Sequence, residues 1–386
     1  MEINSLLANL RRNQFRNMKK LIPNIGLFIL TIIIFSSLHA QENMPIQVVV
    51  AGTSHGHAGW ILNQLVRPEM QVKGIYEPDQ QLVEKQSAKY NIPRELFYKD
   101  LKTALNQLKP EAVLAFGSIK EHLEVVEVAA PLGIHIMVEK PLAANLEDAL
   151  KMKELADKHK VMLLTNFETS WYPSTAESFR LVKDSQFAGQ LRKVVFHHGH
   201  QGPKEIGVGD EFFKWLTDPI LNGGGALMDF GCYGANLATC LLNGQEPLSV
   251  TAVTNQFKPL IYPKVDDDAT IILHYSTLQV IIQASWNWTF NRKDMEIYGD
   301  RAAIFALNAN KMRFRDNKNG SENEKIVTDK DISVYTNPFT YLHAVLRGKE
   351  KPSPFGLYTL ENNIIVNMIL EAAKKSAATG KTVKLK

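Results

Sequence analysis

Cysteine is nearly absent from this chain of 386 residues, which contains only two. Cys232 and Cys240 lie in a stretch with helical spacing, roughly 12 Å apart along the axis at 1.5 Å per residue. A disulfide requires Cα atoms closer than about 7 Å, so the two cannot bridge within an intact helix. The sequence therefore excludes a small disulfide-held scaffold. Its length and its hydrophobic content of 45% predict two globular domains instead.

Long apolar runs are missing as well, because the run at residues 25–35 is shorter than the roughly 20 residues that cross a membrane. Basic residues precede this run and small residues follow it up to Ala40, which is the pattern of a secretory signal. We expect residues 1–40 to be a signal peptide, with an uncleaved anchor as the alternative. The mature protein is then periplasmic or secreted, without stable membrane insertion after cleavage.

The chain also lacks a marked excess of either charge, with 44 Lys and Arg against 40 Asp and Glu. Residues 1–40 hold five of the basic side chains and one acidic one, which leaves 39 of each sign after cleavage. A neutral mature protein gives no indication of binding nucleic acid. The expected partner is a small molecule.

Strand and helix patterns alternate along the first part of the chain. Apolar strand-like runs occur at residues 46–51, 71–76, 112–116, 134–138 and 161–165, with helical patterns between them. This alternation predicts an α/β fold with a doubly wound parallel sheet over residues 41–166. Residues 167–356 carry longer β-rich runs, which predict an α+β domain with a large, mostly antiparallel, open-faced sheet. Residues 357–386 are expected to contain a final helix. Asp266–Asp268 precede a strand and are expected to form a solvated turn.

A glycine-rich turn follows the first expected strand. Gly52, Ser54, His55 and Gly56 form a loop in which main-chain amides can approach a pyrophosphate. Glu77 ends the second strand, where its carboxylate can accept hydrogen bonds from ribose hydroxyls and repel a 2′-phosphate. The sequence therefore predicts a dinucleotide site that prefers NAD over NADP.

Two further motifs carry chemistry. Lys140 follows the strand at residues 134–138 and precedes Pro141, which restricts its backbone and makes a cis peptide accessible. An ammonium at the carboxyl edge of a parallel sheet lies where such folds bind ligands. Asp229 and Tyr233, after three consecutive glycines that we expect to let a ligand come close, share one helix face and suit a sugar hydroxyl.

Together these motifs resemble the glucose-fructose oxidoreductase and inositol dehydrogenase family (Gfo/Idh/MocA) over nearly the whole chain after residue 40. The resemblance rests on the Gly52 turn, Glu139-Lys140-Pro141, the glycine stretch 223–225 with Asp229 and Tyr233, residues 265–267 and residues 297–299. It implies that Lys140, Asp229 and Tyr233 are catalytic. It further implies that Gly117, His122, Glu139 and Lys140 contact the cofactor, that the sheet domain binds a carbohydrate and an oligomer partner, and that the last helix returns to the first domain.

The chain departs from the family at three places. Gly117-Ser118 replaces a Thr-Pro found in many members, Tyr233 replaces a frequent His, and residues 170–173 replace a common Arg at the start of the second domain. The identity of the sugar is therefore not carried over from better-known members.

The resulting hypothesis is hydride transfer between a carbinol carbon of a sugar and a nicotinamide. Tyr233 would exchange the proton, with its pKa lowered by the Lys140 ammonium. Because free nicotinamide is not expected outside the cytoplasm, a tightly held cofactor is expected. The alternatives are a redox-neutral NAD-dependent glycoside-cleaving enzyme, which oxidises, eliminates and re-reduces, and a non-catalytic carbohydrate-binding protein.

No metal site is expected. His197, His198 and His200 are interpreted as sheet-face histidines that line the substrate cleft rather than as ion ligands, because no clustered Cys or acidic ligand accompanies them. For Trp286 and Trp288 the alternatives are stacking on a sugar and burial in a core or subunit contact.

Overall fold

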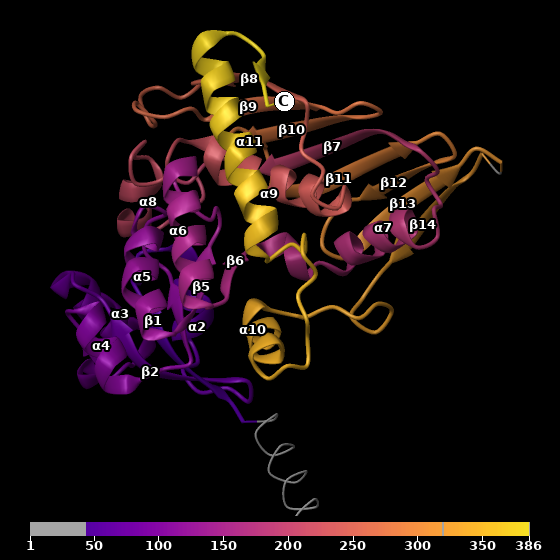
Figure 1. The fold of residues 1–386 in the computed structure, drawn as a ribbon. Coiled ribbons are helices and arrows are strands. Elements are labelled where there is room, and N and C mark those ends of the chain that lie inside the picture. The colour runs from indigo at the N-terminus through magenta and orange to yellow at the C-terminus, as the bar shows by residue number, and fades with distance from the viewer. Residues whose placement is uncertain (1–43, 319, 386) are drawn as a thin grey trace, which may run out of the picture.

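The first sheet consists of parallel strands (Figure 1). The computed structural model describes residues 44–318 and 320–385, so the expected signal peptide at residues 1–40 lies outside the described residues. The strands are β1 (Ile46–Ala51), β2 (Met70–Tyr76), β3 (Phe97–Tyr98), β4 (Ala112–Ala115), β5 (His135–Glu139) and β6 (Leu163–Asn166). Their order is β3-β2-β1-β4-β5-β6. This arrangement confirms the predicted doubly wound sheet.

Helices cover both faces of this sheet, because alternate strand residues point to opposite sides. In β1, Val49 and Ala51 belong to the core shared with α4, α5 and α6, whereas Val48 and Val50 belong to the core shared with α2 and α10. Helix α10 comes from within residues 167–356, so that stretch contributes to the first domain's core. The elements are η1 (Gly56–Ala58), α2 (Gly59–Leu62), α3 (Gln80–Tyr90), η2 (Arg94–Leu96), α4 (Leu101–Leu108), α5 (Glu121–Ala129), η3 (Ala130–Leu132), α6 (Leu146–His159) and α10 (Pro338–Leu346).

The second sheet is mostly antiparallel, as predicted, with a parallel pair, β7 and β10, at its centre. Its order is β14-β13-β12-β11-β7-β10-β9-β8-β15. The strands are β7 (Leu191–Gly199), β8 (Ser249–Asn255), β9 (Asp268–His274), β10 (Gln279–Ser285), β11 (Arg292–Gly299), β12 (Ala302–Ala306), β13 (Lys311–Asp316), β14 (Glu322–Ile326) and β15 (Val383–Lys384). The helices of this half are η4 (Glu168–Trp171), α7 (Pro173–Lys183), α8 (Asp210–Leu216), α9 (Ala226–Leu241) and α11 (Leu360–Thr379).

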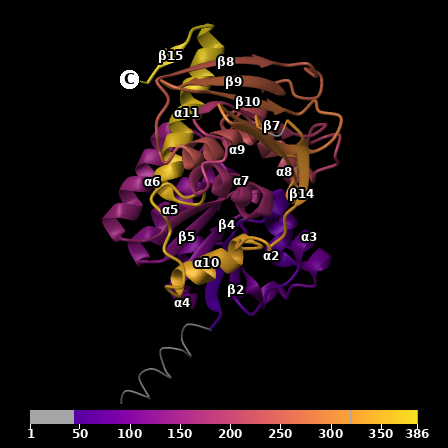
Figure 2. The same ribbon diagram turned by 90° about the vertical axis from the view of Figure 1, so that its right-hand side faces the viewer.

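Helices α9 and α11 cover one face of the second sheet (Figures 1 and 2). Helix α9 is buried along its whole length. Helix α11 reaches both domains, since Asn367 donates to the main-chain oxygen of Ala143 at 2.7 Å and the Ser376 hydroxyl accepts from Ala252 N in β8 at 2.9 Å. Within the described residues, no helix combines the length and the apolar character that crossing a bilayer requires. The two cysteines, both in α9, are free, as expected.

The glycines before α9 permit close approach of the protein's own backbone, a role that the sequence did not indicate; the expected approach of a ligand stays a prediction. A Cβ on Gly223 would strike the main chain of Ala144, and one on Gly225 would strike that of Asp266. Asp266 then caps the helix, accepting from Gly225 N at 3.0 Å and from Leu227 N at 2.7 Å. The expected solvated turn at Asp266–Asp268 is thus wrong, because Asp266 is a cap and Asp267 is fully buried.

Gly52, directly after β1, sits where only glycine fits. Its φ is +77°, and a Cβ would lie 2.7 Å from Gly117 N in the loop that follows β4. Gly133 has a similar φ of +72° but open space around it. Comparing substitutions at Gly52 and Gly133 therefore separates two contributions to the free energy of unfolding: the strain of a left-handed backbone, present at both, and the steric clash, present only at Gly52.

We predict that Gly52→Ala lowers the free energy of unfolding more than Gly133→Ala does. The left-handed backbone alone should cost about 1 kcal/mol in each variant, and the clash with Gly117 should add about 1–3 kcal/mol in the first. Urea denaturation without added nucleotide measures both. Equal losses would show that the loop at Gly117 yields without cost.

Candidate active site

Lys140, at the end of β5, connects the two domains. Its peptide bond to Pro141 is cis. The residue is 6% exposed, and its ammonium donates to the Oδ1 carboxylate oxygen of Asp229 and, at 3.2 Å, to the Asp229 main-chain oxygen. Burial lowers the pKa of Lys140, but the Asp229 carboxylate outweighs this effect and leaves the pKa above its usual value. The ammonium therefore stays charged at neutral pH.

Asp229 lies in the first turn of α9 and is held from both sides. While Lys140 binds Oδ1, the Trp286 indole N–H donates to Oδ2 at 2.9 Å. Burial raises the pKa of Asp229, but the charge and hydrogen bond of Lys140 prevail and leave the pKa below its usual value. Trp286 is fully buried, so it supports this carboxylate and does not stack on a sugar. No local pattern in the sequence indicates that role for Trp286.

Tyr233 follows Asp229 by one turn, and its ring faces two ammonium groups. The ring centroid lies 5.3 Å from Lys140 Nζ and 5.7 Å from Lys293 Nζ. Burial raises the pKa of Tyr233 well above its usual value, and the charge of Glu168 adds to the effect. The expected lowering of this pKa is therefore wrong for this structure, because burial disfavours the charged phenolate.

A second ion pair, missed by the sequence reasoning, stands beside Tyr233. Lys293 in β11 donates to Glu168 Oε2 at 2.8 Å, and the Tyr172 hydroxyl donates to Oε1 at 2.5 Å. Burial raises the pKa of Glu168, but Lys293 reverses this and leaves it below its usual value. Lys293 thus supplies a cation near the start of the second domain, where the family's usual Arg is absent.

The nucleotide turn is arranged around Glu77. Thr53 donates to Glu77 Oε2 from its main-chain N at 2.9 Å and from its hydroxyl at 2.7 Å, and Asp79 N donates to Oε1 at 3.1 Å. Each carboxylate oxygen accepts about two hydrogen bonds, so Oε1 retains room for one more donor. One ribose hydroxyl therefore fits this carboxylate.

His122 and Glu139 lie behind the turn. His122 is fully buried, its Nδ1 pairs with Leu142 O at 3.1 Å, and its Nε2 has no partner. Burial lowers the pKa of His122 to about 4. Glu139 Oε1 accepts from the Asn166 amide at 2.7 Å. Both residues thus hold the segment that carries Lys140.

His55, His57 and Glu139 form a group whose ligand atoms lie within 4.8 Å of one another and could hold a metal ion. His57 Nδ1 is 3.0 Å from Glu139 Oε2, and His55 Nδ1 accepts from His57 N at 3.0 Å. Because Nδ1 of His55 is thus deprotonated, the neutral ring carries its proton on Nε2 and has no free lone pair there. The group fits a hydrogen-bonded cluster better than a metal centre.

Helix α8 of the second domain covers the nucleotide turn. The His55 ring lies 4.9 Å from that of Phe212 and 5.6 Å from that of Trp215, measured between centroids. Lys85 of α3 pairs with Glu211 at 2.7 Å. These contacts join α8 to the first domain directly over the turn.

Two cavities follow from this arrangement. One of about 190 Å³ is lined by Gly52, Ser54, Glu77, Gly117 and His122. The other, about 570 Å³, runs from Ser54, His55 and Gly56 to Lys140, Asp229 and Tyr233. The smaller cavity fits part of a dinucleotide. Gly52 lines it, Oε1 of Glu77 can accept a further hydrogen bond, and Nε2 of His122 has no partner. Glu139 lines neither cavity and acts through its neighbours.

Two family models match this chain. The model for the GFO/IDH/MocA oxidoreductase family with an NAD-binding Rossmann fold matches residues 46–167, and the model for the GFO/IDH/MocA C-terminal domain matches residues 179–305. Among solved structures, the aldose-aldose oxidoreductase of Caulobacter crescentus complexed with glycerol has a TM-score of 0.72 at 22% identity and covers 88% of this chain and 100% of its own. An inositol dehydrogenase homolog from Azotobacter vinelandii, complexed with NAD⁺, has a TM-score of 0.73 at 18% identity, with 88% and 97% covered. These likenesses show the fold.

Curated relatives match over shorter stretches. The D-xylose 1-dehydrogenase [NADP(+)] of Haloarcula marismortui is 33% identical over 129 residues, which are 33% of this chain and 34% of that protein. The trans-1,2-dihydrobenzene-1,2-diol dehydrogenase of Xenopus tropicalis is 32% identical over 168 residues, 42% and 46% of the two chains. The chain thus spans a third to a half of the length of these relatives.

Because Lys140 and Asp229 form a buried ion pair, the effects of substituting them on the free energy of unfolding should not be additive. Lys140→Met should cost about 3–5 kcal/mol, because it leaves the Asp229 carboxylate buried without its counter-charge. Adding Asp229→Asn to the same chain should recover part of this loss, since the amide is neutral and still accepts from Trp286. Urea denaturation at pH 7 of the two single variants and the double variant measures the coupling. Strictly additive losses would contradict a direct charge interaction.

Proposed function

Since the chain belongs to the GFO/IDH/MocA family of oxidoreductases with an NAD-binding Rossmann domain, we propose that it transfers a hydride to or from a carbinol carbon of a sugar or sugar derivative. The observation that carries this proposal is the convergence of Lys140, Asp229 and Tyr233 on one cavity that also reaches the nucleotide turn. A bound nicotinamide would supply the hydride chemistry. The protein supplies position and charge.

Lys140 holds the reacting oxygen in this proposal. A charged ammonium favours an oxygen that gains negative character, and Asp229 fixes its direction. Trp286 in turn fixes Asp229, so the ammonium is oriented before a substrate arrives.

Tyr233 exchanges the proton. Its raised pKa keeps the phenol protonated at neutral pH, a form that donates a proton to a sugar carbonyl oxygen when the substrate is reduced. Oxidation in the reverse direction needs the phenolate and therefore a lower pKa in the working complex. A bound cationic nicotinamide would favour that charged form.

We propose that the mature protein is periplasmic or secreted and that it retains its cofactor tightly. The targeting pattern of residues 1–40 supports export. The contacts that α8 makes with the nucleotide turn support retention, because Phe212 lines the cavity next to His55 and narrows the way out of it. A retained cofactor favours reactions that regenerate it within one catalytic cycle.

A homo-oligomer is part of the same proposal. On the side of the second sheet opposite α9, Val195, Ile272 and Ile281 are register neighbours on β7, β9 and β10 and remain half-exposed. An apolar stripe of this kind suits contact with a second copy of the chain.

Lys140→Ala should leave nucleotide binding intact and cut turnover at least about 100-fold, because the ammonium acts on the reacting oxygen and not on the pyrophosphate. The exposed Lys151→Ala serves as control. Steady-state kinetics with a sugar panel and analysis of nucleotide released from the purified protein measure the two effects. Near-normal turnover would discard the assignment. Protein without bound nucleotide and without affinity for NAD would favour the non-catalytic alternative.

The redox-neutral glycoside-cleaving reaction would use the same residues, so its product is what distinguishes it from simple hydride transfer. With an aryl glycoside and no added cofactor, an oxidoreductase should form a carbonyl product without releasing the phenol. Phenol release that is lost in Lys140→Ala would instead establish glycoside cleavage by oxidation, elimination and re-reduction.

A further inference from the structure

His200 also lines the cavity that contains Lys140, but it comes from a different element, the end of β7. It follows directly after β7 and lines the same cavity as Lys140, Asp229 and Tyr233. Its main chain is fixed on both sides, because His200 N donates to Ser285 O at 3.1 Å and His200 O accepts from Trp288 N at 3.2 Å. The position of this side chain is therefore set by the sheet and not by a free loop.

The ring of His200 is also fixed. Gly202 N donates to His200 Nδ1 at 2.9 Å, and the ring stands edge-on to Phe230 with a centroid distance of 5.0 Å and an interplanar angle of 88°. Phe230 is the residue next to Asp229, so the imidazole and the carboxylate are placed by the same turn of α9.

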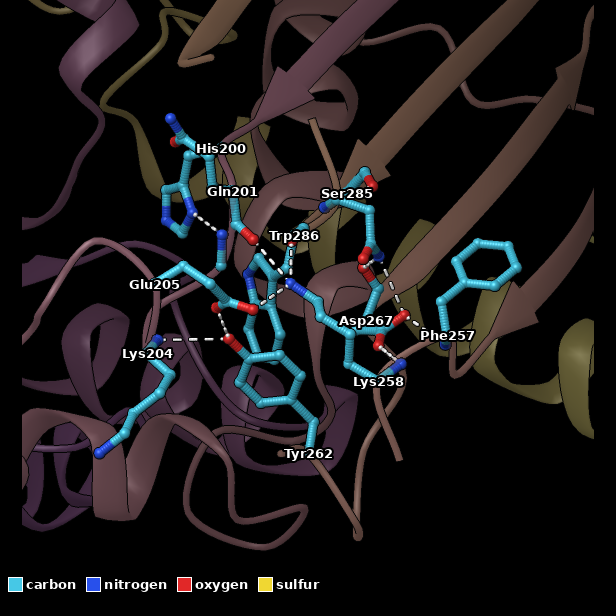
Figure 3. Close-up of polar contacts among 12 residues, drawn as sticks. His200, Gln201, Lys204, Glu205, Phe257, Lys258, Tyr262, Asp267, Ser285 and Trp286 are labelled. Carbon is cyan, nitrogen blue, oxygen red and sulfur yellow. Dashed lines mark hydrogen bonds and ion pairs between the residues drawn. The ribbon is translucent and has the colours of Figure 1, made fainter. Parts of the chain in front are cut away.

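Lys258 clamps the turn that carries His200 (Figure 3). Its ammonium donates to Gln201 O at 2.6 Å, to Glu205 Oε1 at 2.5 Å and to Trp286 O at 2.7 Å, which uses all three of its protons. The buried Asp267 in turn accepts from Phe257 N at 2.9 Å and from Lys258 N at 2.6 Å. A single ammonium thus aligns the His200 turn with Trp286, the residue that holds Asp229.

The hydrogen bond at Nδ1 determines where the ring proton sits. A nitrogen that accepts from a backbone N–H carries no proton, so the neutral ring carries its proton on Nε2. Burial lowers the pKa of His200 to about 4. The charged groups that face it are Asp229, Lys293, Lys140 and Glu205, of which the two carboxylates raise the pKa and the two ammonium groups lower it. The ring is therefore neutral at pH 7.

We propose that His200 is a fixed, neutral hydrogen-bond donor whose Nε2–H binds an oxygen of the substrate, a role that rests on the proposed function of the cavity. A neutral imidazole donates without giving up its proton, so it suits a hydroxyl or carbonyl oxygen and disfavours a cationic group at the same position. His200 then selects for a substrate with a second oxygen near the reacting one, as in a sugar or polyol. Its donation also stays constant over a pH range in which an ordinary histidine would titrate.

Paired substitutions test the role in the full-length mature protein. His200→Gln keeps an N–H donor at a similar reach and should retain kcat/KM within about tenfold, whereas His200→Leu should lower it about 10–100-fold, mostly through KM. Nucleotide binding should not change in either variant. Equal kinetics for His200→Leu and the wild type would overturn the proposal. An equal loss in both variants, without rescue by Gln, would reduce His200 to a packing residue and overturn it as well.

A second measurement does not depend on turnover, so its failure is distinct from a failure of the proposed function. Long-range ¹H–¹⁵N spectra of histidine-labelled protein, assigned with His200→Gln, report the tautomer of each ring. The proposal expects the Nε2–H form of His200 without titration between pH 5.5 and 8. Lys258→Met should loosen the turn and mix the two tautomers. A Nδ1–H form in the wild type, or a midpoint near 6.5, would overturn the proposal.

Discussion

The structure depends on one buried ion pair between two domains. Lys140 comes from the edge of the first sheet and Asp229 from a helix that lies on the second, and neither has another charged partner at hydrogen-bond distance among the described residues. Removing two charges from water is costly and is offset only when the geometry is held closely. Much of the surrounding structure provides that geometry: the glycine approach to Ala144, the Asp266 cap on α9 and the Trp286 indole.

Local patterns in the sequence correctly predicted the elements whose position depends only on neighbouring residues. Alternating strands and helices predicted the first sheet, and the turn at Gly52 and the strand end at Lys140 predicted groups at one carboxyl edge, because parallel strands share that edge. The helical spacing of Asp229 and Tyr233 predicted that they share a face. These inferences needed only neighbours in the chain.

Roles that depend on distant parts of the chain could not be predicted in this way. Lys293 reaches the site through the register of β11 on β7, and Trp286 reaches it because it directly follows β10; no local spacing encodes either position. Asp266 and Asp267 read as a charged turn, yet their partners lie at Gly225, Leu227, Phe257 and Lys258. The pKa of Tyr233 was misjudged because burial raises it, and Glu168, which adds to the effect, is distant in the sequence. Burial and pairing are tertiary properties, so residue type alone could not supply them.

The span of α11 across both domains bears on how the molecule is made. Asn367 contacts the first domain, Ser376 contacts the second sheet, and β15 adds to the edge of that sheet at β8. A nascent chain still lacking residues 360–384 therefore misses the brace between its halves, however complete the earlier segments are. We therefore infer that the two halves complete their mutual contacts only once this last segment of the chain is in place.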